Sequence, residues 1–277
     1  MKLSFNTMIW FGEPISKRCD RLQRYGYDGA EFVYGLEPID FSAVAAELRS
    51  RNLPASSVGC LCPPGRDLSH TDPDIRRATI TYMKEAVAAA HEVESPIVYA
   101  SPTEGLKITP CASEDDEWKW AVAGLRAVGE YAQTMGVRLA VEAWNRYESY
   151  MLLTACDTRR MVTEIGLENV GCMLDTFHLN IEEPIIPDAI ELTENSLFHM
   201  HFADSQRTAP GTGHIDFGPI LIALKRINYE GYITMELIPA AGDPFAVVRS
   251  GQATAFFDEY TEQTVNYLRK LSAAVGY

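Results

Sequence analysis

Four side chains that can bind a metal ion or transfer protons stand at the ends of four consecutive apolar segments: Glu142, Asp175, His201 and Glu236. Burying three carboxylates and an imidazole among apolar residues is unfavourable unless another charge compensates them. One divalent cation would compensate all four. A mixed set of carboxylate oxygens and imidazole nitrogen suits Mn²⁺, Co²⁺ or Mg²⁺ better than metals that select thiolates. We therefore expect one such cation per chain, with Mn²⁺ as the first choice.

A charge at the end of a strand could instead pair with a neighbouring Lys or Arg. This alternative is open for any one of the four residues. Pairing with Lys or Arg explains all four residues together less well, because no matching set of four Lys or Arg side chains stands at neighbouring strand ends.

Eight short β-rich apolar segments recur along the chain, and helix-like stretches separate them. The strand candidates are Leu3–Trp10, Gly29–Val33, Ala55–Gly59, Ile97–Ser101, Arg138–Trp144, Val170–Thr176, Leu197–Asp204 and Tyr232–Ile238. The helix candidates are Ile75–Glu92, Glu117–Met135, Asp157–Ile165 and a closing helix over Phe256–Ala273. Strands that alternate with helices form parallel sheets through right-handed crossovers. We therefore predict an α/β fold, a single (β/α)8 TIM-barrel domain over residues 1–277.

An open doubly wound sheet is the alternative architecture. Such a sheet more often has a glycine-rich loop after its first strand, whereas Phe11-Gly12-Glu13-Pro14 is neither a dinucleotide-binding nor a P-loop motif. Gly26, Gly136 and Asn228 stand where helices should end before the next strand, which predicts C-caps and short loops. In a closed barrel, the carboxyl ends of the strands and the loops after them build the active site. The four metal-binding candidates should therefore meet there.

Composition excludes several classes of function. The formal net charge of −14 argues against a nucleic-acid partner and, more weakly, against a heavily phosphorylated sugar. The six cysteines lack disulfide-scaffold spacing, and Cys60-Leu61-Cys62 is not a zinc motif, so reduced thiols are expected. No segment approaches the ~20 apolar residues of a membrane helix, and the N-terminus lacks a signal-peptide pattern. We expect a cytoplasmic protein without a membrane partner.

Specific motifs surround the four residues. They are Val141-Glu142-Ala143-Trp144-Asn145-Arg146-Tyr147-Glu148, Leu174-Asp175-Thr176-Phe177-His178-Leu179-Asn180-Ile181-Glu182-Glu183, the stretch from His199-Met200-His201 to Arg207-Thr208-Ala209-Pro210-Gly211, and Met235-Glu236. With them the chain resembles the xylose-isomerase-like TIM barrels (sugar phosphate isomerases and epimerases), and among these the D-tagatose and D-psicose (ketose) 3-epimerases. The resemblance covers nearly the whole chain.

The resemblance implies a role for each matching position. Glu142, Asp175, His201 and Glu236 would be the metal ligands, and Glu142 and Glu236 would also be the catalytic acid/base pair. Glu148, His178 and Arg207 match substrate-contacting positions, and a sugar is the implied small-molecule substrate. The implied reaction is C3 epimerisation of a free ketose: the metal acidifies the C3 hydrogen, one Glu removes that proton, and the other returns a proton to the opposite face through an enediolate.

Other readings of the accessory residues stay open. His178 could be a hydrogen-bonded histidine at a strand end, and Arg207 could be a solvated loop charge. If His201 faces the barrel interior, so does His199, one layer lower, where it could support the ligands. Trp10 would be a core residue by default, but its place at the end of the first strand suits an apolar wall against a sugar face.

Departures from the ketose 3-epimerase pattern leave other reactions of the superfamily open. The loop Cys60–Leu68, the step Val93–Pro96 and the motif Gly213–Phe217 do not copy that group. Alternatives with the same metal cage are hydroxypyruvate isomerase, inosose dehydratase and a lyase subunit that cleaves 3-oxo C-glycosides with a β-sandwich partner. A sugar-binding barrel without turnover is the non-enzymatic alternative. The resemblance also implies a homodimer or homotetramer.

Overall fold

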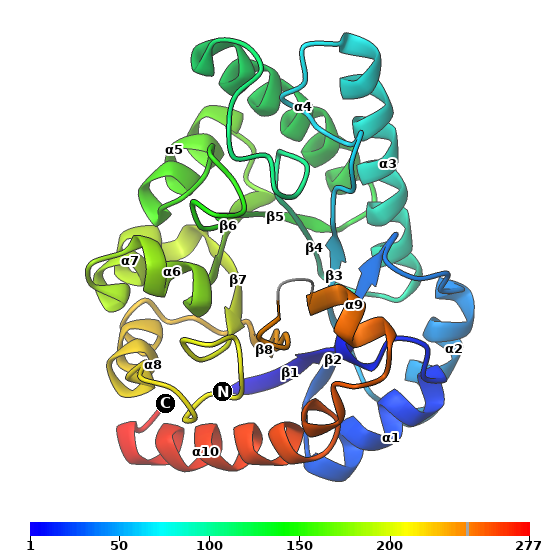
Figure 1. Cartoon of the computed structure of the whole chain (residues 1–277), viewed down its shortest axis with the longest axis vertical. Helices are drawn as coiled ribbons and strands as arrows, with labels where there is room; N and C mark the ends of the chain where they lie inside the picture. The colour runs from blue at the N-terminus through cyan, green and yellow to red at the C-terminus, as the bar shows by residue number, and fades with distance from the viewer. Residues whose placement is uncertain (242–243) are drawn as a thin grey trace.

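Eight parallel strands close into a barrel in the computed structural model, which describes residues 1–241 and 244–277 (Figure 1). Each strand pairs with the next along the chain, and β1 pairs with β8. The strands are β1 (Lys2–Asn6), β2 (Gly29–Tyr34), β3 (Ala55–Cys60), β4 (Ile97–Ala100), β5 (Arg138–Glu142), β6 (Val170–Asp175), β7 (Leu197–Phe202) and β8 (Tyr232–Met235). The predicted closed (β/α)8 architecture is confirmed.

Helices form the outer layer around the strands (Figure 1). The longer helices are α1 (Ile15–Tyr25), α2 (Phe41–Arg51), α3 (Pro73–Glu92), α4 (Glu114–Thr134), α5 (Ala155–Ile165), α7 (Ile186–Thr193), α8 (Phe217–Arg226) and α10 (Glu259–Val275). Shorter ones are η1 (Thr7–Trp10), α6 (Thr176–Glu182), η2 (Glu194–Ser196), α9 (Pro244–Arg249) and η3 (Thr254–Phe256). The predicted left-handed helix ends are present, with φ of 77° at Gly26, 68° at Gly136 and 54° at Asn228.

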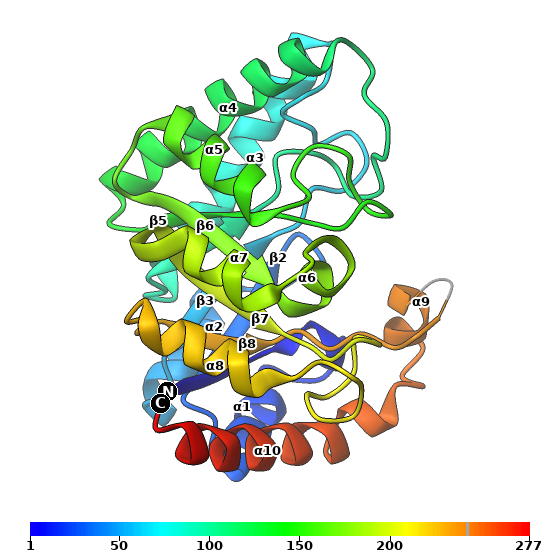
Figure 2. The same cartoon turned by 90° about the vertical axis from the view of Figure 1, so that its left-hand side faces the viewer.

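The two ends of the barrel differ. Both chain termini lie at one end, whereas α6, α9 and the long loops after the strands lie at the other (Figure 2). The carboxyl ends of the strands point toward that second end. We call it the mouth.

The first strand is shorter than the predicted segment Leu3–Trp10. It ends at Asn6, whose side-chain Oδ1 accepts a hydrogen bond from the backbone N–H of Met8 at 3.0 Å. This cap starts the 3-10 turn η1, because a short polar side chain that binds the backbone locally competes with strand pairing. The chain therefore turns at the mouth before it reaches Trp10.

The register between β6 and β7 brings two of the predicted ligands side by side. The pairing skips Phe198, and beyond this bulge Asp175 pairs with His201. Gly171 leaves room for the bulge, since a Cβ there would lie 2.5 Å from the ring of Phe198. Because a one-residue slip turns every side chain to the other face, the bulge determines which side chains of β7 point into the barrel.

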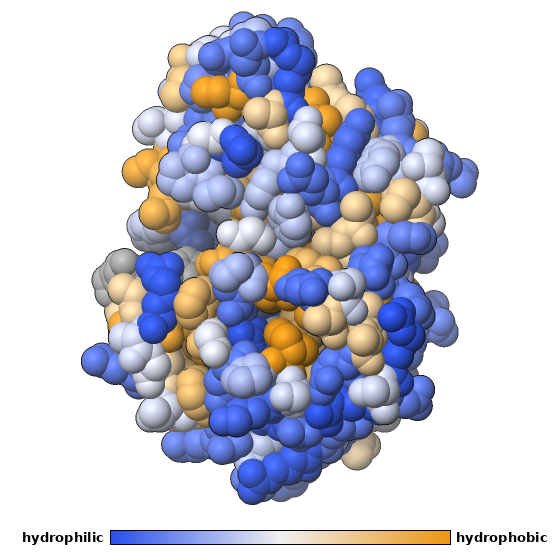
Figure 3. Space-filling view, turned by 90° about the vertical axis from the view of Figure 1, so that its right-hand side faces the viewer, coloured by the Kyte–Doolittle hydropathy of each residue, from blue (hydrophilic) through white to orange (hydrophobic). Residues whose placement is uncertain are grey.

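The interior of the barrel holds both polar side chains and a small apolar cluster of Ile97, Tyr99, Ala140 and Met173, whereas the layer between strands and helices is apolar. Ser4, Glu31 and Tyr99 are buried inside, while Leu3 and Phe5 point outward into the main hydrophobic cluster. The face that carries α2 and α3 is mostly hydrophilic, with smaller apolar patches (Figure 3). Within residues 1–241 and 244–277, no helix is both long and apolar enough to cross a membrane. All six cysteines are free thiols, and four of them are buried.

Candidate active site

The four predicted metal-binding residues meet at the mouth of the barrel. Glu142 ends β5, Asp175 ends β6, His201 lies near the end of β7, and Glu236 directly follows β8. One ligand atom from each lies within 4.8 Å of the others, and all four side chains are buried. We refer to this group as the ligand cluster. Its convergence follows from the parallel barrel, in which successive strands end at the same rim.

The cluster fits a divalent cation by two observations. Asp175 Oδ2 and His201 Nδ1 are buried without a hydrogen-bond partner among the described residues. Buried polar atoms are rarely left in that state, and both belong to the cluster. Three carboxylates and one imidazole are also a donor set for Mn²⁺, Mg²⁺ or Co²⁺. These residues could hold one such ion.

Charge within the cluster is unevenly distributed. Burial and the neighbouring Glu236 raise the pKa of Glu142 above its usual range. Burial would also raise the pKa of Glu236, but His201 and Arg207 outweigh it and hold that pKa well below its usual range. For His201, burial is outweighed by Glu31 and Glu236, so its pKa is raised. Two carboxylates whose environments push their pKa values apart are typical of an acid/base pair.

Arg207 reaches the cluster from the loop after β7. Its Nη2 lies 2.5 Å from Glu236 Oε2 and 3.7 Å from Asp175 Oδ2, and its Nη1 lies 3.4 Å from Glu148 Oε1. Its guanidinium also stacks over the ring of Phe177 at 4.8 Å. The side chain is 15% exposed, so it is not a solvated surface charge.

Asp204 builds the loop that carries Arg207. It is fully buried, and its carboxylate accepts hydrogen bonds from the backbone N–H groups of Gly211 and Ile215 at 2.8 and 3.1 Å. Its carbonyl oxygen accepts the N–H of Arg207 at 2.7 Å, where the chain is left-handed with φ of 58°. A Cβ on Gly213 would lie 2.2 Å from Asp204 Oδ1, so this loop requires glycine there.

Glu148 and His178 lie together beside the cluster. Asn145 Nδ2 donates to Glu148 Oε1 at 2.8 Å and to His178 Nδ1 at 2.8 Å. Burial and the charge of Arg207 lower the pKa of His178 well below its usual value, so its ring is neutral. With Nδ1 occupied as an acceptor, the ring carries its proton on Nε2. The structure thus brings three of the four predicted substrate-contacting residues together.

Trp10, the fourth, lies elsewhere. Its ring is fully buried, stacks on Phe5 with centroids 4.8 Å apart, and lies under the guanidinium of Arg21 at 4.6 Å. Its Nε1 donates to the carbonyl of Phe256 at 3.4 Å. Because η1 turns the chain after Asn6, the side chain points into the layer between the barrel and the helices. Trp10 has a core position and not the predicted position against a sugar face.

Glu31 in the middle of β2 was missed by sequence reasoning. It is fully buried and faces both histidines of β7, with His199 Nε2 at 2.9 Å and His201 Nε2 at 3.0 Å. His199 therefore faces the interior below the cluster, as predicted from its spacing. A Glu inside the otherwise apolar run Gly29–Val33 was the available signal, but it lies in mid-strand, away from the strand ends that build a barrel's active site.

Three loops at the mouth are tied together by a buried ionic network. Lys107 Nζ donates to Asp67 Oδ2 at 2.8 Å, to Ser69 Oγ at 2.7 Å and to Glu117 Oε2 at 2.7 Å. Tyr150 donates to the same Glu117 carboxylate. Asp67 and Ser69 follow β3, Lys107 follows β4 and Tyr150 follows β5. The network joins the segments that border Glu148, whose carbonyl oxygen accepts the N–H of Leu106 at 2.9 Å.

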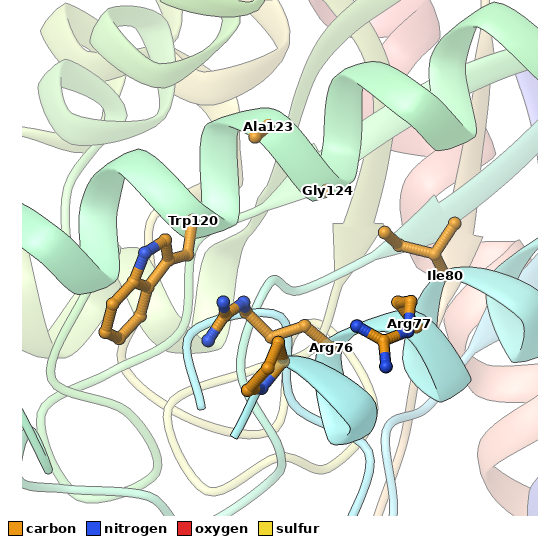
Figure 4. Close-up of a pocket in the computed structure, with 7 residues that line it drawn as sticks. Arg76, Arg77, Ile80, Trp120, Ala123 and Gly124 are labelled. Carbon is orange, nitrogen blue, oxygen red and sulfur yellow. The ribbon is translucent and has the colours of Figure 1, made fainter. Parts of the chain in front are cut away.

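A surface hollow of about 260 Å³ lies between α3 and α4, lined by Pro73, Arg76, Arg77, Ile80, Trp120, Ala123 and Gly124 (Figure 4). Arg76 stacks over Trp120 at 4.3 Å and donates to the carbonyl oxygen of Thr71 at 2.9 Å. Both helices belong to the outer layer, so this hollow is separate from the ligand cluster.

Comparisons with known proteins agree with this geometry. A family model described as "Xylose isomerase-like TIM barrel" matches residues 19–260. The D-psicose 3-epimerase of Enterocloster bolteae is 33% identical over 238 residues, which cover 83% of this chain and 78% of that protein. The 3-dehydro-D-guloside 4-epimerase of Escherichia coli is 27% identical over 261 residues, 91% of this chain and 98% of that protein.

Solved structures show the same fold. The structure of D-psicose 3-epimerase with D-tagatose from Clostridium cellulolyticum H10 aligns with a TM-score of 0.87 at 24% identity. The alignment covers 98% of this chain and 99% of that chain.

Proposed function

The chain belongs to the xylose isomerase-like TIM barrel family, with ketose 3-epimerases among its relatives, and we propose that it is a metal-dependent epimerase that inverts C3 of a free ketose. This kinship supports an enzyme of the epimerase or isomerase type. We further propose a metal, a reacting carbon and roles for individual residues.

One observation carries the proposal: two buried glutamates approach a single point from different strands. Glu142 comes from β5 and Glu236 from the end of β8, with Asp175 and His201 between them on β6 and β7. Inversion at carbon requires a base on one face and an acid on the other. Carboxylates that converge from two sides on one site meet this requirement.

The residues would divide the reaction as follows. When bound by the four ligands, the divalent cation supplies positive charge next to the ketose carbonyl and hydroxyl oxygens. Glu236 accepts the C3 proton as the C3–H bond breaks, which leaves an enediolate. Glu142 donates a proton to the opposite face, and the two roles exchange in the reverse reaction. Arg207, Glu148 and the Nε2–H of His178 would hold the sugar hydroxyls.

The direct test is an isotope experiment on the Mn²⁺-loaded chain. D-psicose, D-tagatose and L-ribulose are incubated with enzyme in D2O, and products are examined by NMR. We expect a C3 epimer that carries deuterium at C3. Inversion at C3 without any solvent label, with no internal return of the proton, would exclude the two-glutamate scheme.

A second candidate reaction is C4 epimerisation of a 3-oxo glycoside. It is supported by the E. coli 4-epimerase, to which this chain aligns over 98% of that protein's length. Removing a proton next to a 3-ketone uses the same cation and the same base, so the cluster serves either substrate. Deuterium at C4 of a 3-oxo glucoside, with the free ketoses unchanged, would decide for this candidate. Release of the aglycone from a 3-oxo C-glycoside, together with a co-purifying partner chain, would favour the lyase that cleaves such glycosides.

A further inference from the structure

The carboxylate of Glu31 is surrounded by hydrogen-bond donors. Besides His199 and His201, the hydroxyl of Tyr99 donates to its Oε1 at 3.1 Å and the hydroxyl of Ser57 donates to its Oε2. Glu31 has no exposed surface. An ionised carboxylate only accepts hydrogen bonds and offers about four sites for them. Every site of Glu31 is therefore filled by a protein donor.

This arrangement determines where each histidine carries its proton. A ring nitrogen that faces an ionised carboxylate at hydrogen-bond distance must carry a hydrogen. In both histidines that nitrogen is Nε2. When the ring binds a cation, Nε2 keeps its hydrogen and the lone pair is on Nδ1, which has no hydrogen-bond partner among the described residues and lies 3.5 Å from Glu236 Oε2. It is the nitrogen that faces the ligand cluster.

The same carboxylate is connected to a second ligand. Tyr99 donates its hydroxyl hydrogen to Glu31, so its oxygen is free to accept Asn6 Nδ2 at 3.3 Å. The same Asn6 amide group donates to Glu236 Oε1 at 3.2 Å. Since Asn6 Oδ1 is held by the N–H of Met8, its amide cannot flip without losing these contacts. A series of oriented hydrogen bonds thus runs from Glu31 to Glu236.

We propose that Glu31 is the positioning residue of the metal centre: it fixes His201 with Nδ1 free to bind the cation and, through Tyr99 and Asn6, fixes the carboxylate of Glu236. The inference rests on the metal site of the proposed function. In this proposal β2 contributes to a metal centre whose ligands all come from β5 to β8. In this role Glu31 would act through His201 and Glu236 and would touch neither the cation nor the sugar.

The first test is the affinity for Mn²⁺ alone, measured by calorimetry on the full chain. Glu31→Gln keeps the shape of the side chain but places an NH2 group against at least one of the donors, so His201 loses its fixed orientation. We expect the affinity to fall about ten- to hundredfold, as for other partners that orient metal-bound histidines. The matched control is Ser95→Ala, which removes a buried hydrogen bond of 2.9 Å to the carbonyl oxygen of Ile97 at the start of β4. Ser95→Ala should retain the wild-type affinity.

A role in barrel packing alone gives a different result. Glu31→Gln would then lower the melting temperature but bind Mn²⁺ as tightly as wild type, and this outcome would overturn the inference. If the variant does not fold, the tautomer of the His201 ring in the wild-type chain tests the role of Glu31. In Mg²⁺-saturated protein labelled with ¹⁵N, the hydrogen of His201 should be on Nε2. A hydrogen on Nδ1 would overturn the proposal.

These measurements separate the inference from the proposed function. Wild-type protein that binds no divalent cation would overturn both. Tight Mn²⁺ binding that is unchanged in Glu31→Gln would overturn only the role of Glu31. Weakened binding in Glu31→Gln, in a wild-type chain that turns over neither ketoses nor 3-oxo glycosides, would support the role of Glu31 and refute the proposed substrates.

Discussion

The guanidinium of Arg207 and the carboxylate of Glu236 lie 2.5 Å apart, which joins the loop after β7 to the end of β8 inside the ligand cluster. Arg207 also spans from Glu236 to Glu148, so it borders both the proposed metal ligands and the proposed sugar contacts. Together with His201, its charge outweighs the effect of burial, lowers the pKa of Glu236 and keeps that carboxylate ionised. A loop residue thus contributes to the electrostatics of the strand ends.

Arg207→Ala should mainly impair substrate binding. Loss of a buried, charge-assisted contact to sugar hydroxyls should raise KM roughly tenfold or more, about 1.4 kcal/mol. Metal content should stay near one ion per chain, because the four ligands remain. Steady-state kinetics and metal analysis check both expectations, with Arg160→Ala on the exposed face of α5 as the control. Loss of the metal with an unchanged KM would contradict the assignment.

Glu236→Gln should reduce turnover. The amide keeps the shape of the side chain but cannot accept the C3 proton, so kcat should fall roughly a hundredfold or more. Incorporation of deuterium from D2O should fall with it. The control is Glu130→Gln on the exposed surface of α4. A Glu236→Gln variant with full rate would mean that another group removes the proton.

Removal of the metal should abolish activity. Three carboxylates that share one site repel each other, and among residues 1–241 and 244–277 the basic groups within salt-bridge distance of them are Arg207 and His201. Treatment with a chelator should inactivate the enzyme, and Mn²⁺ or Co²⁺ should restore it. Metal at one hundred times its Kd should stabilise the fold by about 2.7 kcal/mol, which raises the melting temperature by several degrees. Full activity of metal-free protein would refute the dependence.

Gly213→Ala should displace Arg207 without touching the metal ligands. The added methyl group would meet Asp204 Oδ1 at 2.2 Å, so the carboxylate that holds the loop would have to move. KM should rise while Mn²⁺ affinity stays close to wild type. Gly105→Ala is the matched control in another mouth loop, because its Cβ would lie 3.7 Å from Trp144, an ordinary contact. Equal effects of the two substitutions would argue against a positioning role for Asp204.

Glu117→Gln should weaken the fold at neutral pH more than in acid. Burial would raise the pKa of Glu117, but Lys107, Tyr150 and two backbone N–H groups outweigh it and lower the pKa to about 2 from 4.5. Because the pKa is lower in the folded state, the stabilisation is complete above pH 4.5 and is lost as the pH falls toward 2. We expect the free energy of unfolding at pH 7 to fall by about 2–3 kcal/mol.

Urea unfolding at pH 7 and pH 3 measures the Glu117 effect. The difference between wild type and Glu117→Gln should be smaller at pH 3, because part of the wild-type stabilisation is then lost. The control is Glu130→Gln, which shows how the same substitution at an exposed glutamate changes the free energy of unfolding at each pH. A difference that does not change with pH would mean that the charge of Glu117 contributes nothing to stability.

The sequence was sufficient to predict the barrel and the ligand cluster because both rest on local patterns. Apolar runs that alternate with helical periodicity determine the parallel barrel, and a barrel places strand ends together. Glu142, Asp175 and Glu236 could therefore be located without any tertiary information. His199 could also be placed, since a strand alternates its faces.

Other parts of the site depend on contacts between residues that are distant in the sequence. Glu31 is 170 residues from His201, and no local pattern indicates that β2 faces β7 across the barrel. Trp10 was misplaced because the Asn6 cap ends β1 early and turns the chain outward. A side-chain cap at a strand end changes the direction of the residues that follow the strand. The periodicity of apolar residues alone does not reveal such a cap.

The closure of the barrel also has a practical consequence for handling the protein. Arg269 in α10 donates to the carbonyl of Met1 at 3.1 Å and to Asp28 Oδ2 at 2.6 Å. The N-terminus is therefore anchored on the end of the barrel opposite the mouth. The C-terminus lies at the same end, where the hydroxyl of Tyr277 donates to the carbonyl of Tyr229 at 2.6 Å (Figure 2). An affinity tag, a fusion protein or a covalent tether to a resin can be attached at either terminus while the mouth faces the bulk solution. Immobilisation for preparative sugar conversion should thus leave the route to Glu236 open.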